Sequence, residues 1–559
     1  MGRENKRGNR TAGTTQHYPG GRYDLDLFGE NGSPGLLPAG HGCLARERAD
    51  FLPGGFRSHE RDARATSITN VAYRCTPSAP RRMPGLAFTA PALFSLFSYT
   101  ALAAAYGARL APHSTMSAAH AHPSSAPHHT DKKTLWKVIS ASSAGTLIEW
   151  YDFFVYGALA TLIAGHFFPK DNPTAAFLLT LATFATGFIV RPFGAIVFGH
   201  IGDLVGRKYT FLLTLLLMGG ATFAIGLLPD YETIGIAAPI CLVLLRLVQG
   251  LALGGEYGGA ATYVAEHTPR AHRGFYTSFI QITATGGLLL AIVVILLVRQ
   301  AIGVEKFTAW GWRLPFLLSI VLVGLSYYIR IKMEESPLFA KAKAAGKLAV
   351  NPIKESFMNP VNRRLVLIAL FGATAGQGVV WYTGQFYAMF FLQKVLNIGY
   401  ETSLILIATA LVLGTPFFVL FGSLSDKIGR KPVILGGMLL AAILYIPLFM
   451  GLSHFAQPLN HVMIVALLFV MVLLVAMTYG PIAAYLVEIF PTRIRYTSMS
   501  LPYHVGNGIF GGLTPLIATS MVAHFGNPYA GLAYPIGIAL ATTIIGAIYL
   551  KESRHSEME

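Results

Sequence analysis

Twelve long apolar segments follow one another between residues 138 and 550, and they constrain the fold more than any other feature of this sequence. A helix rises about 1.5 Å per residue, so roughly 20 apolar residues cross the hydrocarbon core of a bilayer, which is about 30 Å thick. We therefore expect an all-α protein embedded in a lipid bilayer. The predicted spans are residues 138–167, 174–200, 209–228, 237–264, 275–298, 309–331, 365–393, 402–424, 432–452, 462–485, 498–522 and 529–550.

The composition and the placement of basic residues support this interpretation. Only 13% of the residues are charged, against about 25% in soluble proteins, which argues against a soluble enzyme. From residue 116 onward, one alternate set of loops carries 22 Lys and Arg and the other set carries five. Because cytoplasmic loops carry the excess, both termini are predicted to be cytoplasmic. The net charge of +16 then needs no nucleic acid partner, and the three separated cysteines indicate no metal site.

An internal duplication relates the two halves of the membrane region. The loop GHIGDLVGRK at residues 199–208 returns as GSLSDKIGRK at residues 422–431, an offset of 223. The pattern YxxExxPxxxR starts at Tyr263 and again at Tyr485, an offset of 222. Two signatures with nearly one period indicate a repeated six-helix unit. The predicted divisions are an N-terminal bundle at 136–331, a cytoplasmic central loop at 332–364, a C-terminal bundle at 365–551 and a cytoplasmic tail at 552–559.

This arrangement resembles the major facilitator superfamily over residues 136–552. Five further motifs resemble its metabolite:proton symporter group, a relative of the sugar porters: EWYDFF from Glu149, RPFG from Arg191, RLVQG from Arg246, GGEYG from Gly254 and ESP from Glu335. The resemblance implies two six-helix bundles around a central site that opens alternately to each side. It also implies a functional monomer and a small polar substrate such as shikimate, 2-oxoglutarate, citrate, proline or betaine.

Charged side chains inside the spans are costly, so each needs a partner or a role. In the related sugar porters a first-helix Tyr-Asp faces a fourth-helix Arg, and the matching residues here are Asp152 and Arg246. The hypothesis is that Arg246 keeps Asp152 ionised until helix movement separates them and the carboxyl takes a proton. The alternative is a permanent structural ion pair. Glu149 is the rival proton carrier, and Glu256 is interpreted as a gate or packing residue.

Substrate recognition is expected mostly in the C-terminal half, where the spans offer amides and aromatic rings instead of charges. Arg191 in the second span either holds a substrate carboxylate in a bidentate manner or neutralises Glu149 or Glu256. Aromatic residues in membrane helices also serve as packing or interface anchors, which is the alternative for the rings. The predicted substrate-binding residues are Arg191, Gln249, Gln377, Trp381, Tyr382, Gln385 and Tyr387.

The two GxxxDxxGRK loops imply a cytoplasmic latch, by resemblance to the family. Asp203 and Asp426 are expected to accept hydrogen bonds from neighbouring helix ends and from arginines such as Arg273 and Arg495. The alternative is that the loops only anchor a turn and supply positive charge to the cytoplasmic face. The predicted gate residues are Asp203, Gly206, Arg207, Lys208, Glu266, Arg273, Asp426, Arg430, Lys431, Glu488 and Arg495.

Residues 1–135 are predicted to be a disordered extension, and we expect translation to begin at Met116. The apolar stretch 86–106 is too diluted by proline and small polar residues to be a convincing thirteenth span. The histidines in this extension are not expected to form a functional metal site. They are His120, His122, His128 and His129.

The leading prediction is a secondary transporter of a bacterial inner membrane that couples a small polar metabolite, most simply a carboxylate, to protons. No GxxxxGK[ST] phosphate loop occurs in the sequence, so an ion gradient is expected to drive transport, without a cofactor. A sugar or polyol porter or facilitator is one alternative. A membrane sensor that does not transport is an alternative of another class. No nucleophile-base or metal constellation indicates an enzyme.

Overall fold

The computed structural model describes residues 132–204, 207–331, 352–492 and 494–554, and these ranges are all-α. Within them, eleven helices are long and apolar enough to cross a membrane, or twelve when α2 (Lys132–Ala158) and α3 (Ala160–Phe167) count as one bent span. The predicted order and number of spans are thereby confirmed. The extension with Met116 and its histidines, and residues 332–351 of the central loop, lie outside the described ranges.

The first six spans form the N-half, which is residues 132–331. Besides α2 and α3 it contains α4 (Pro173–Ile189), α5 (Arg191–Leu204), α6 (Arg207–Leu227), α7 (Tyr231–Ile234), α8 (Ala237–Gly254), α9 (Tyr257–His267), η1 (Arg270–His272), α10 (Arg273–Ile302), α11 (Val304–Ala309), η2 (Gly311–Arg313), α12 (Leu314–Leu317) and α13 (Ser319–Ile331).

The C-half is residues 352–554. It contains α15 (Pro352–Met358), α16 (Pro360–Ala369), η3 (Leu370–Thr374), α17 (Ala375–Tyr382), η4 (Thr383–Tyr387), α18 (Ala388–Phe390), η5 (Phe391–Val395), α19 (Tyr400–Ile428), α20 (Arg430–His454), α21 (His461–Tyr479), α22 (Ile482–Ile489), α23 (Arg495–His504), η6 (Val505–Gly511), α24 (Thr514–Phe525), η7 (Ala530–Leu532) and α25 (Ala533–Tyr549).

Asparagine caps start several of these helices. The side chain of Asn172 accepts a hydrogen bond from the backbone N of the third residue that follows it, and Asn460 does the same. Asn359 accepts from a backbone N two residues later. Pro173 and Pro360 occupy the first helical position, where a missing N–H costs nothing. The seventh span thus starts at Pro360, five residues before its predicted boundary.

The first span is bent, although the sequence predicts one continuous helix over 138–167. Its two parts meet at an angle of 62° around Leu159. The bend exposes the carbonyl of Ala158, which accepts a hydrogen bond of 3.0 Å from the hydroxyl of Tyr400 in the C-half. A broken helix is tolerated inside a membrane when another helix supplies the missing hydrogen bond, and Tyr400 does so here.

The seventh and eleventh spans contain π-helical turns that the sequence does not predict. Three of them, η3, η4 and η5, interrupt the seventh span, and η6 interrupts the eleventh. A π-helical turn shifts the register of the side chains after it, and such turns are frequent at functional sites. Both interrupted spans line the seam between the halves.

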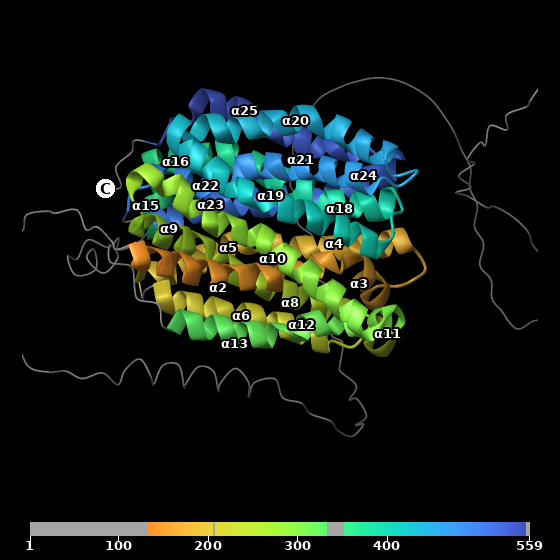
Figure 1. Ribbon diagram of the computed structural model, residues 1–559. Helices are drawn as coiled ribbons and strands as arrows, with labels where there is room; N and C mark the ends of the chain where they lie inside the picture. The colour runs from red at the N-terminus through yellow and green to blue at the C-terminus, as the bar shows by residue number, and fades with distance from the viewer. Residues whose placement is uncertain (1–131, 205–206, 332–351, 493, 555–559) are drawn as a thin grey trace, which may run out of the picture. The chain divides into compact units, whose positions relative to one another are not determined.

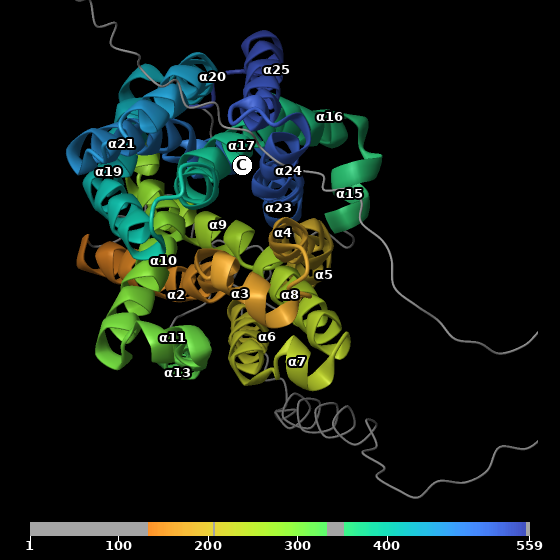
Figure 2. The same cartoon turned by 90° about the vertical axis from the view of Figure 1, so that its right-hand side faces the viewer.

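The two halves meet along several pairs of helices. Helix α10 packs against α2 of its own half and against α19 of the C-half, while α5 packs on α23 and α4 on α24. Figure 2 looks along the helices and shows the N-half, orange to green, below the C-half, teal to blue. We call the end of the bundle that carries α9 and α15 the loop end, and the opposite end, with α3, α11 and α18, the far end (Figure 1).

Candidate functional site

Asp426 joins the two halves at the loop end. Its carboxylate accepts hydrogen bonds of 2.8 Å from the backbone N–H groups of Gly274 and Phe275, in the first turn of α10. Arg430, from its own half, donates to it at 2.7 Å. A carboxylate at a helix N-terminus is stabilised by the helix dipole. The predicted acceptance from a neighbouring helix end is therefore observed, but the arginine partner is Arg430 instead of Arg273 or Arg495.

Arg273 and Arg495 each bind a glutamate of the opposite half. Nη1 of Arg273 lies 3.1 Å from Oε1 of Glu488, and Nη1 of Arg495 lies 3.5 Å from Oε1 of Glu266. For Asp426 the prediction of Arg273 or Arg495 as partner is wrong, and for Asp203 it stays a prediction because nothing is described of that side chain. Each glutamate of the YxxExxPxxxR signature faces the arginine of the other copy. The two pairs are related by the internal repeat.

The end of the chain supports this cluster from the C-half. Arg430 contacts both carboxylate oxygens of Glu488, at 3.2 and 3.0 Å, and the hydroxyl of Ser553 donates to Glu488 at 2.7 Å. Glu552 accepts from the backbone N–H groups of Arg430 and Lys431 at 2.8 and 3.0 Å, which caps α20. The Lys431 ammonium donates to two carbonyls near the end of α25.

Part of the first GxxxDxxGRK loop lies outside what the structure describes. Gly206 belongs to the undescribed residues, and nothing is described of the side chains of Asp203, Arg207 and Lys208. Their part in a latch stays a prediction.

Arg191 is the central cation of the seam. It is fully buried, yet none of its three guanidinium nitrogens has a hydrogen-bond partner among the described residues. The guanidinium lies 5.1 Å from the centre of the Trp150 ring and 5.6 Å from that of Phe188. The alternative that Arg191 neutralises Glu149 or Glu256 is wrong for this structure, since both carboxylates contact a different arginine, described below.

Polar side chains of the C-half surround Arg191. The Tyr382 hydroxyl lies beside the guanidinium without reaching hydrogen-bond geometry, and the indole N–H of Trp381 has no partner among the described residues. Tyr479 and Tyr503 share a hydrogen bond of 2.6 Å within electrostatic reach of Arg191. Tyr503 was not predicted, since tyrosines abound in these spans and only helix rotation brings this one inward. The seam thus holds a cation and an indole N–H that have no hydrogen-bond partner among the described residues.

Asp152 and Arg246 do not form the predicted pair in this structure. Neither carboxylate oxygen of the fully buried Asp152 has a hydrogen-bond partner among the described residues. Arg246 instead donates to Gln249 at 2.6 Å and to the Phe153 carbonyl at 3.2 Å. Its guanidinium lies 4.1 Å from the centre of the Phe153 ring and 4.8 Å from that of Tyr156, contacts that favour a cation. A permanently closed Asp152–Arg246 pair is therefore excluded.

The predicted glutamines have protein partners. Gln249 holds Arg246 and donates to the Thr222 hydroxyl at 2.7 Å, which positions the arginine. Gln377 exchanges hydrogen bonds of 3.1 and 2.9 Å with Asn507, joining the seventh and eleventh spans. Gln385 donates at 3.2 Å to a threonine of α10, and its amide oxygen has no partner among the described residues. Of the three, only Gln385 keeps a free polar atom.

Arg330 is a buried residue that the sequence did not indicate. It lies one residue before the end of α13, inside the predicted span 309–331, and it is only 4% exposed. Its Nη2 lies 2.8 Å from Oε1 of Glu149 and also contacts Oε1 of Glu256. The sequence offered one signal for such a residue. Two glutamates inside predicted spans need a nearby cation, because a buried charge without a partner is costly.

Aromatic rings fill the seam between Arg191 and the far end. Five pairs cross it, each with one ring from either half and centres between 5.0 and 5.5 Å apart, and they are Phe154–Trp381, Phe154–Phe386, Phe188–Tyr382, Phe184–Phe386 and Phe177–Phe390. These contacts separate the central polar groups from the far end, as the ion pairs do at the loop end. The structure therefore holds its central site closed from both sides.

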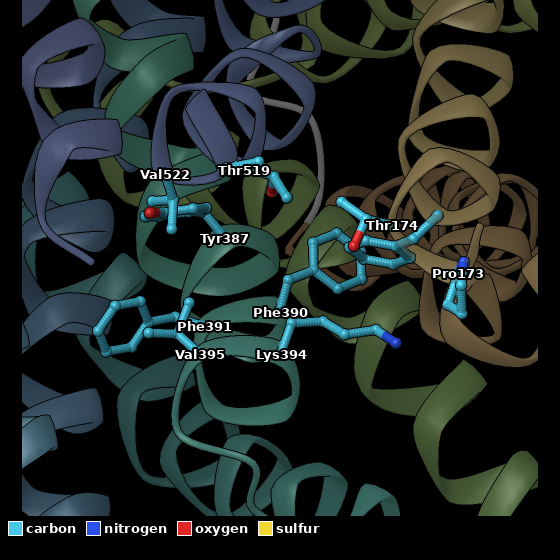
Figure 3. A pocket seen from close by; sticks show the side chains of 11 residues that line it. Pro173, Thr174, Tyr387, Phe390, Phe391, Lys394, Val395, Thr519 and Val522 are labelled. Atoms are coloured by element: carbon cyan, nitrogen blue, oxygen red, sulfur yellow. The ribbon is translucent and has the colours of Figure 1, made fainter. Parts of the chain in front are cut away.

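A cavity of about 210 Å³ opens beyond these rings at the far end. Figure 3 shows Lys394 extending from the seventh span toward α4, where Pro173 and Thr174 lie. The Lys394 ammonium lies 4.9 Å from the centre of the Phe177 ring. Tyr387, a predicted substrate residue, lines this cavity rather than the surroundings of Arg191, and its buried hydroxyl has no partner among the described residues.

Known structures resemble this fold. The proton:xylose symporter XylE, bound to 6-bromo-6-deoxy-D-glucose, superposes with a TM-score of 0.59 at 19% identity, over 77% of this chain and 98% of that one. A D-xylose-proton symporter structure gives 0.58 at 21% identity, over 76% and 100%. At these identities the likeness concerns the fold, which is that of the major facilitator superfamily.

Sequence comparison reaches further. The chain is 37% identical over 427 residues to the inner membrane metabolite transport protein YhjE of Escherichia coli, covering 76% of this chain and 95% of that protein. It is 34% identical over 438 residues to OusA of Dickeya dadantii, a glycine betaine/proline/ectoine/pipecolic acid transporter, covering 77% and 86%. Residues 137–559 match the profile of the sugar (and other) transporter family. The chain therefore belongs to this family of transporters and is an integral inner-membrane transporter, not an enzyme.

Proposed function

We propose that this chain is a proton-coupled symporter of a small metabolite that carries a carboxylate, with Arg191 as the carboxylate anchor. One observation carries the proposal: a fully buried guanidinium stands at the seam of the two halves with no partner for any of its nitrogens among the described residues. Burying an unpaired charge is costly, so such a group implies a bound anion during the transport cycle. Arg suits a carboxylate because its planar fork donates two parallel hydrogen bonds.

The surroundings of Arg191 favour a compact substrate with an apolar or cationic body. Trp150 and Phe188 lie against the guanidinium, and Trp381 stacks on Phe154 within the same aromatic layer. Aromatic faces bind methyl groups and alkylated ammonium groups by packing and cation–π attraction. Glycine betaine, proline, ectoine and pipecolic acid, for which OusA is named, each combine a carboxylate with a small ring or an alkylated nitrogen. Proline, betaine and simple organic acids therefore head the candidates for this chain.

Asp152 is the proposed proton carrier. Its carboxyl is fully buried, and both of its oxygens lack a hydrogen-bond partner among the described residues, which favours the protonated, neutral form. Arg246 lies on α8, where Gln249 of the same helix holds it, and it is the cation that stabilises the ionised form of Asp152 when the helices move. An alternation between these two environments loads and releases one proton per cycle. No cofactor takes part, and a monomer suffices, because the site lies between two halves of one chain.

Alternating access follows from the two closed ends. We assign the loop end to the cytoplasm, because basic residues gather in its loops. Opening there breaks Arg273–Glu488 and Arg495–Glu266, whereas opening at the far end separates the aromatic pairs that cross the seam. The substrate contacts the N-half at Arg191 and the C-half at Tyr382, so its binding affects how the two halves pack against each other.

Uptake into proteoliposomes with an inward proton gradient tests the proposal. Labelled proline, betaine, 2-oxoglutarate, citrate, shikimate and a hexose are compared for the wild type, Arg191→Gln and Arg191→Lys. We expect accumulation of at least one carboxylate, its collapse by a protonophore, its loss in Arg191→Gln and partial recovery in Arg191→Lys. Accumulation of only the neutral hexose, unchanged in Arg191→Gln, would support the sugar-porter alternative and reject the carboxylate anchor.

A further inference from the structure

Two buried glutamates of the N-half contact one nitrogen of a single arginine. Glu149 on α2 and Glu256, between α8 and α9, are each 1% exposed, and Arg330 on α13 is 4% exposed. Nη2 of Arg330 lies 2.8 Å from Oε1 of Glu149 and also contacts Oε1 of Glu256. We call Glu149 and Glu256 the glutamate pair, and Arg330 is the arginine that both contact.

The other contacts of the cluster do not add a second cation. The hydroxyl of Thr146 donates to Oε1 of Glu256 at 3.2 Å, and Nη1 of Arg330 donates to the Phe211 carbonyl at 3.0 Å. Oε2 of Glu256 is buried without a hydrogen-bond partner among the described residues. Close packing holds the arginine in place, because a Cβ atom at Gly145 would lie only 2.8 Å from its Nε. Oε1 of Glu149 also makes no hydrogen bond to a described residue, although it lies 2.8 Å from Nη2 of Arg330. These two unpartnered oxygens are the observation that marks a missing hydrogen.

Charged and titratable neighbours on the surrounding helices leave this balance unchanged. Asp152 has no hydrogen-bond partner in the part of the chain that the structure describes, and Arg246 is bonded to Gln249. The other charged or titratable groups with described side chains on these helices, Arg191 among them, make no hydrogen bond or ion pair with either carboxylate. They include Lys133, Lys137, Tyr151, Tyr156, Arg191, His200, Tyr209, Tyr257, Tyr263, Glu266, His267, Arg273, Tyr276, Tyr327 and Tyr328. Two carboxylates therefore share one guanidinium.

Full ionisation of both glutamates would bury one uncompensated negative charge. It would also place two like charges against the same nitrogen, and like charges in contact oppose a second ionisation. We propose that Glu149 and Glu256 hold one proton between them over Arg330, which makes the pair a second proton-binding site of the N-half. The shared proton supplies the hydrogen that the second oxygen of Glu256 lacks.

The position of the pair assigns it a role in proton release, a role that rests on the proposed function. Glu149 precedes Asp152 by three residues on α2, which runs from the loop end, so the two lie on similar sides of the helix. A proton that leaves the Asp152 carboxyl reaches the ionised member of the pair, while the proton already held there leaves toward the loop end. Asp152 becomes a carboxylate, and the charge of the pair is the same before and after.

Infrared spectroscopy of the full-length protein in lipid tests the shared proton without transport. A protonated carboxyl has a C=O stretch distinct from that of a carboxylate, and it shifts in D₂O. We expect Glu149→Gln and Glu256→Gln each to remove one protonated carboxyl at neutral pH, because the remaining glutamate then has Arg330 to itself and ionises. Retention of the full band in either variant overturns the proposal.

Three further measurements serve as controls for the infrared experiment. Glu401→Gln is the matched control, since Glu401 binds one arginine, Arg299, at 3.3 Å and should contribute no protonated band. Asp152→Asn should leave the signal of the pair in place. Thermal unfolding in detergent checks each variant, and we expect both glutamine variants of the pair to stay folded, because an amide oxygen still accepts from Arg330.

A transport assay then separates this proposal from the proposed function. In Glu256→Gln we expect gradient-driven accumulation to slow about tenfold, while substrate counterflow, which needs no net proton movement, keeps its wild-type rate. Equal slowing of both modes would reject the release role. A wild type that shows no proton-driven accumulation would defeat the proposed function, whereas the infrared result would still decide whether the pair shares a proton.

Discussion

Arg273 and Glu488 form a buried ion pair between the two halves, with 3.1 Å between Nη1 and Oε1. Removing one partner of such a pair ordinarily leaves an uncompensated buried charge, at a cost of about 3–5 kcal/mol. Here the carboxylate keeps Arg430 of its own half, whose Nη2 lies 3.0 Å from the same oxygen. The pair can therefore separate when the loop end opens, and the cost falls mainly on Arg273.

Arg273→Gln should favour the state in which the loop end is open. We expect the equilibrium to shift about tenfold, which corresponds to about 1.4 kcal/mol. Ser278, a buried residue of α10, is replaced by cysteine in a chain without its native cysteines, and labelling by a polar maleimide reports the opening. Faster labelling is expected in the Arg273→Gln background.

Arg364→Gln provides the matched control for that measurement. Arg364 is an exposed arginine of α16, at the same end of the bundle, so its replacement removes one charge without an inter-half bond. Labelling of Ser278→Cys at the same rate in both backgrounds would contradict a latch role for Arg273 and leave the loop motif as an anchor of the turn.

The fold could be predicted from the sequence because the bilayer fixes the length of each span. The spans were recognised by apolar length alone, and most of their predicted boundaries lie within a few residues of the helix ends in the structure. The repeat identified which signature belongs to which half. The bend at Leu159 could not be predicted. The hydrogen bond that accompanies it is donated to the carbonyl of Ala158 by Tyr400, a residue more than 200 positions later in the sequence. The π-helical turns carry no sequence signal of comparable strength.

Within the site, residue types could be predicted but partners could not. Buried charges were recognisable because each is costly in a membrane, which correctly singled out Asp152, Arg191 and Arg246 as buried groups. Which carboxylate meets which arginine depends on helix rotation and on aromatic rings that compete for the cation. Arg246 illustrates this point, since its guanidinium packs over Phe153 and Tyr156, while the expected carboxylate of Asp152 has no hydrogen-bond partner within the described ranges.

Asp152→Asn should uncouple transport from the proton gradient. Asparagine keeps the shape of the neutral carboxyl but cannot release a proton, so we expect accumulation against a gradient to fall to the level of equilibration. Substrate counterflow should continue at a comparable rate. Both are measured in the same proteoliposomes with the substrate identified by the uptake screen. Proton-driven accumulation that persists in this variant would move the carrier role to Glu149.

Lys394→Gln should weaken capture of an anionic substrate at the far end. The ammonium lines the cavity beyond the aromatic rings, so it raises the local concentration of anions by electrostatic attraction. We expect the KM for a carboxylate to rise about threefold at low ionic strength and the difference to vanish at high salt, where charges are screened.

Lys306→Gln is the control for this effect. Lys306 is exposed on α11, at the far end, but does not line the cavity. Equal effects of the two lysine substitutions would attribute the change to surface charge in general. A maximal rate that falls with an unchanged KM in Lys394→Gln would likewise argue against a capture role.

Gly254→Ala should disturb Arg191 through the backbone. Glycines four residues apart on α8 predict close helix packing, and in the structure a Cβ atom at Gly254 would collide with the carbonyl of Arg191 and lie 2.8 Å from the backbone N of Ala195. Overpacking of this kind costs about 1–3 kcal/mol. We expect a lower unfolding temperature and a raised KM, because α5 carries the carboxylate anchor. Gly220→Ala is the counterpart, since a Cβ atom there meets nothing within 4 Å, and its stability and KM should match the wild type. If Gly254→Ala lowered stability but left KM unchanged, the packing of α8 on α5 would be structural only, and Arg191 would be positioned by its aromatic neighbours instead.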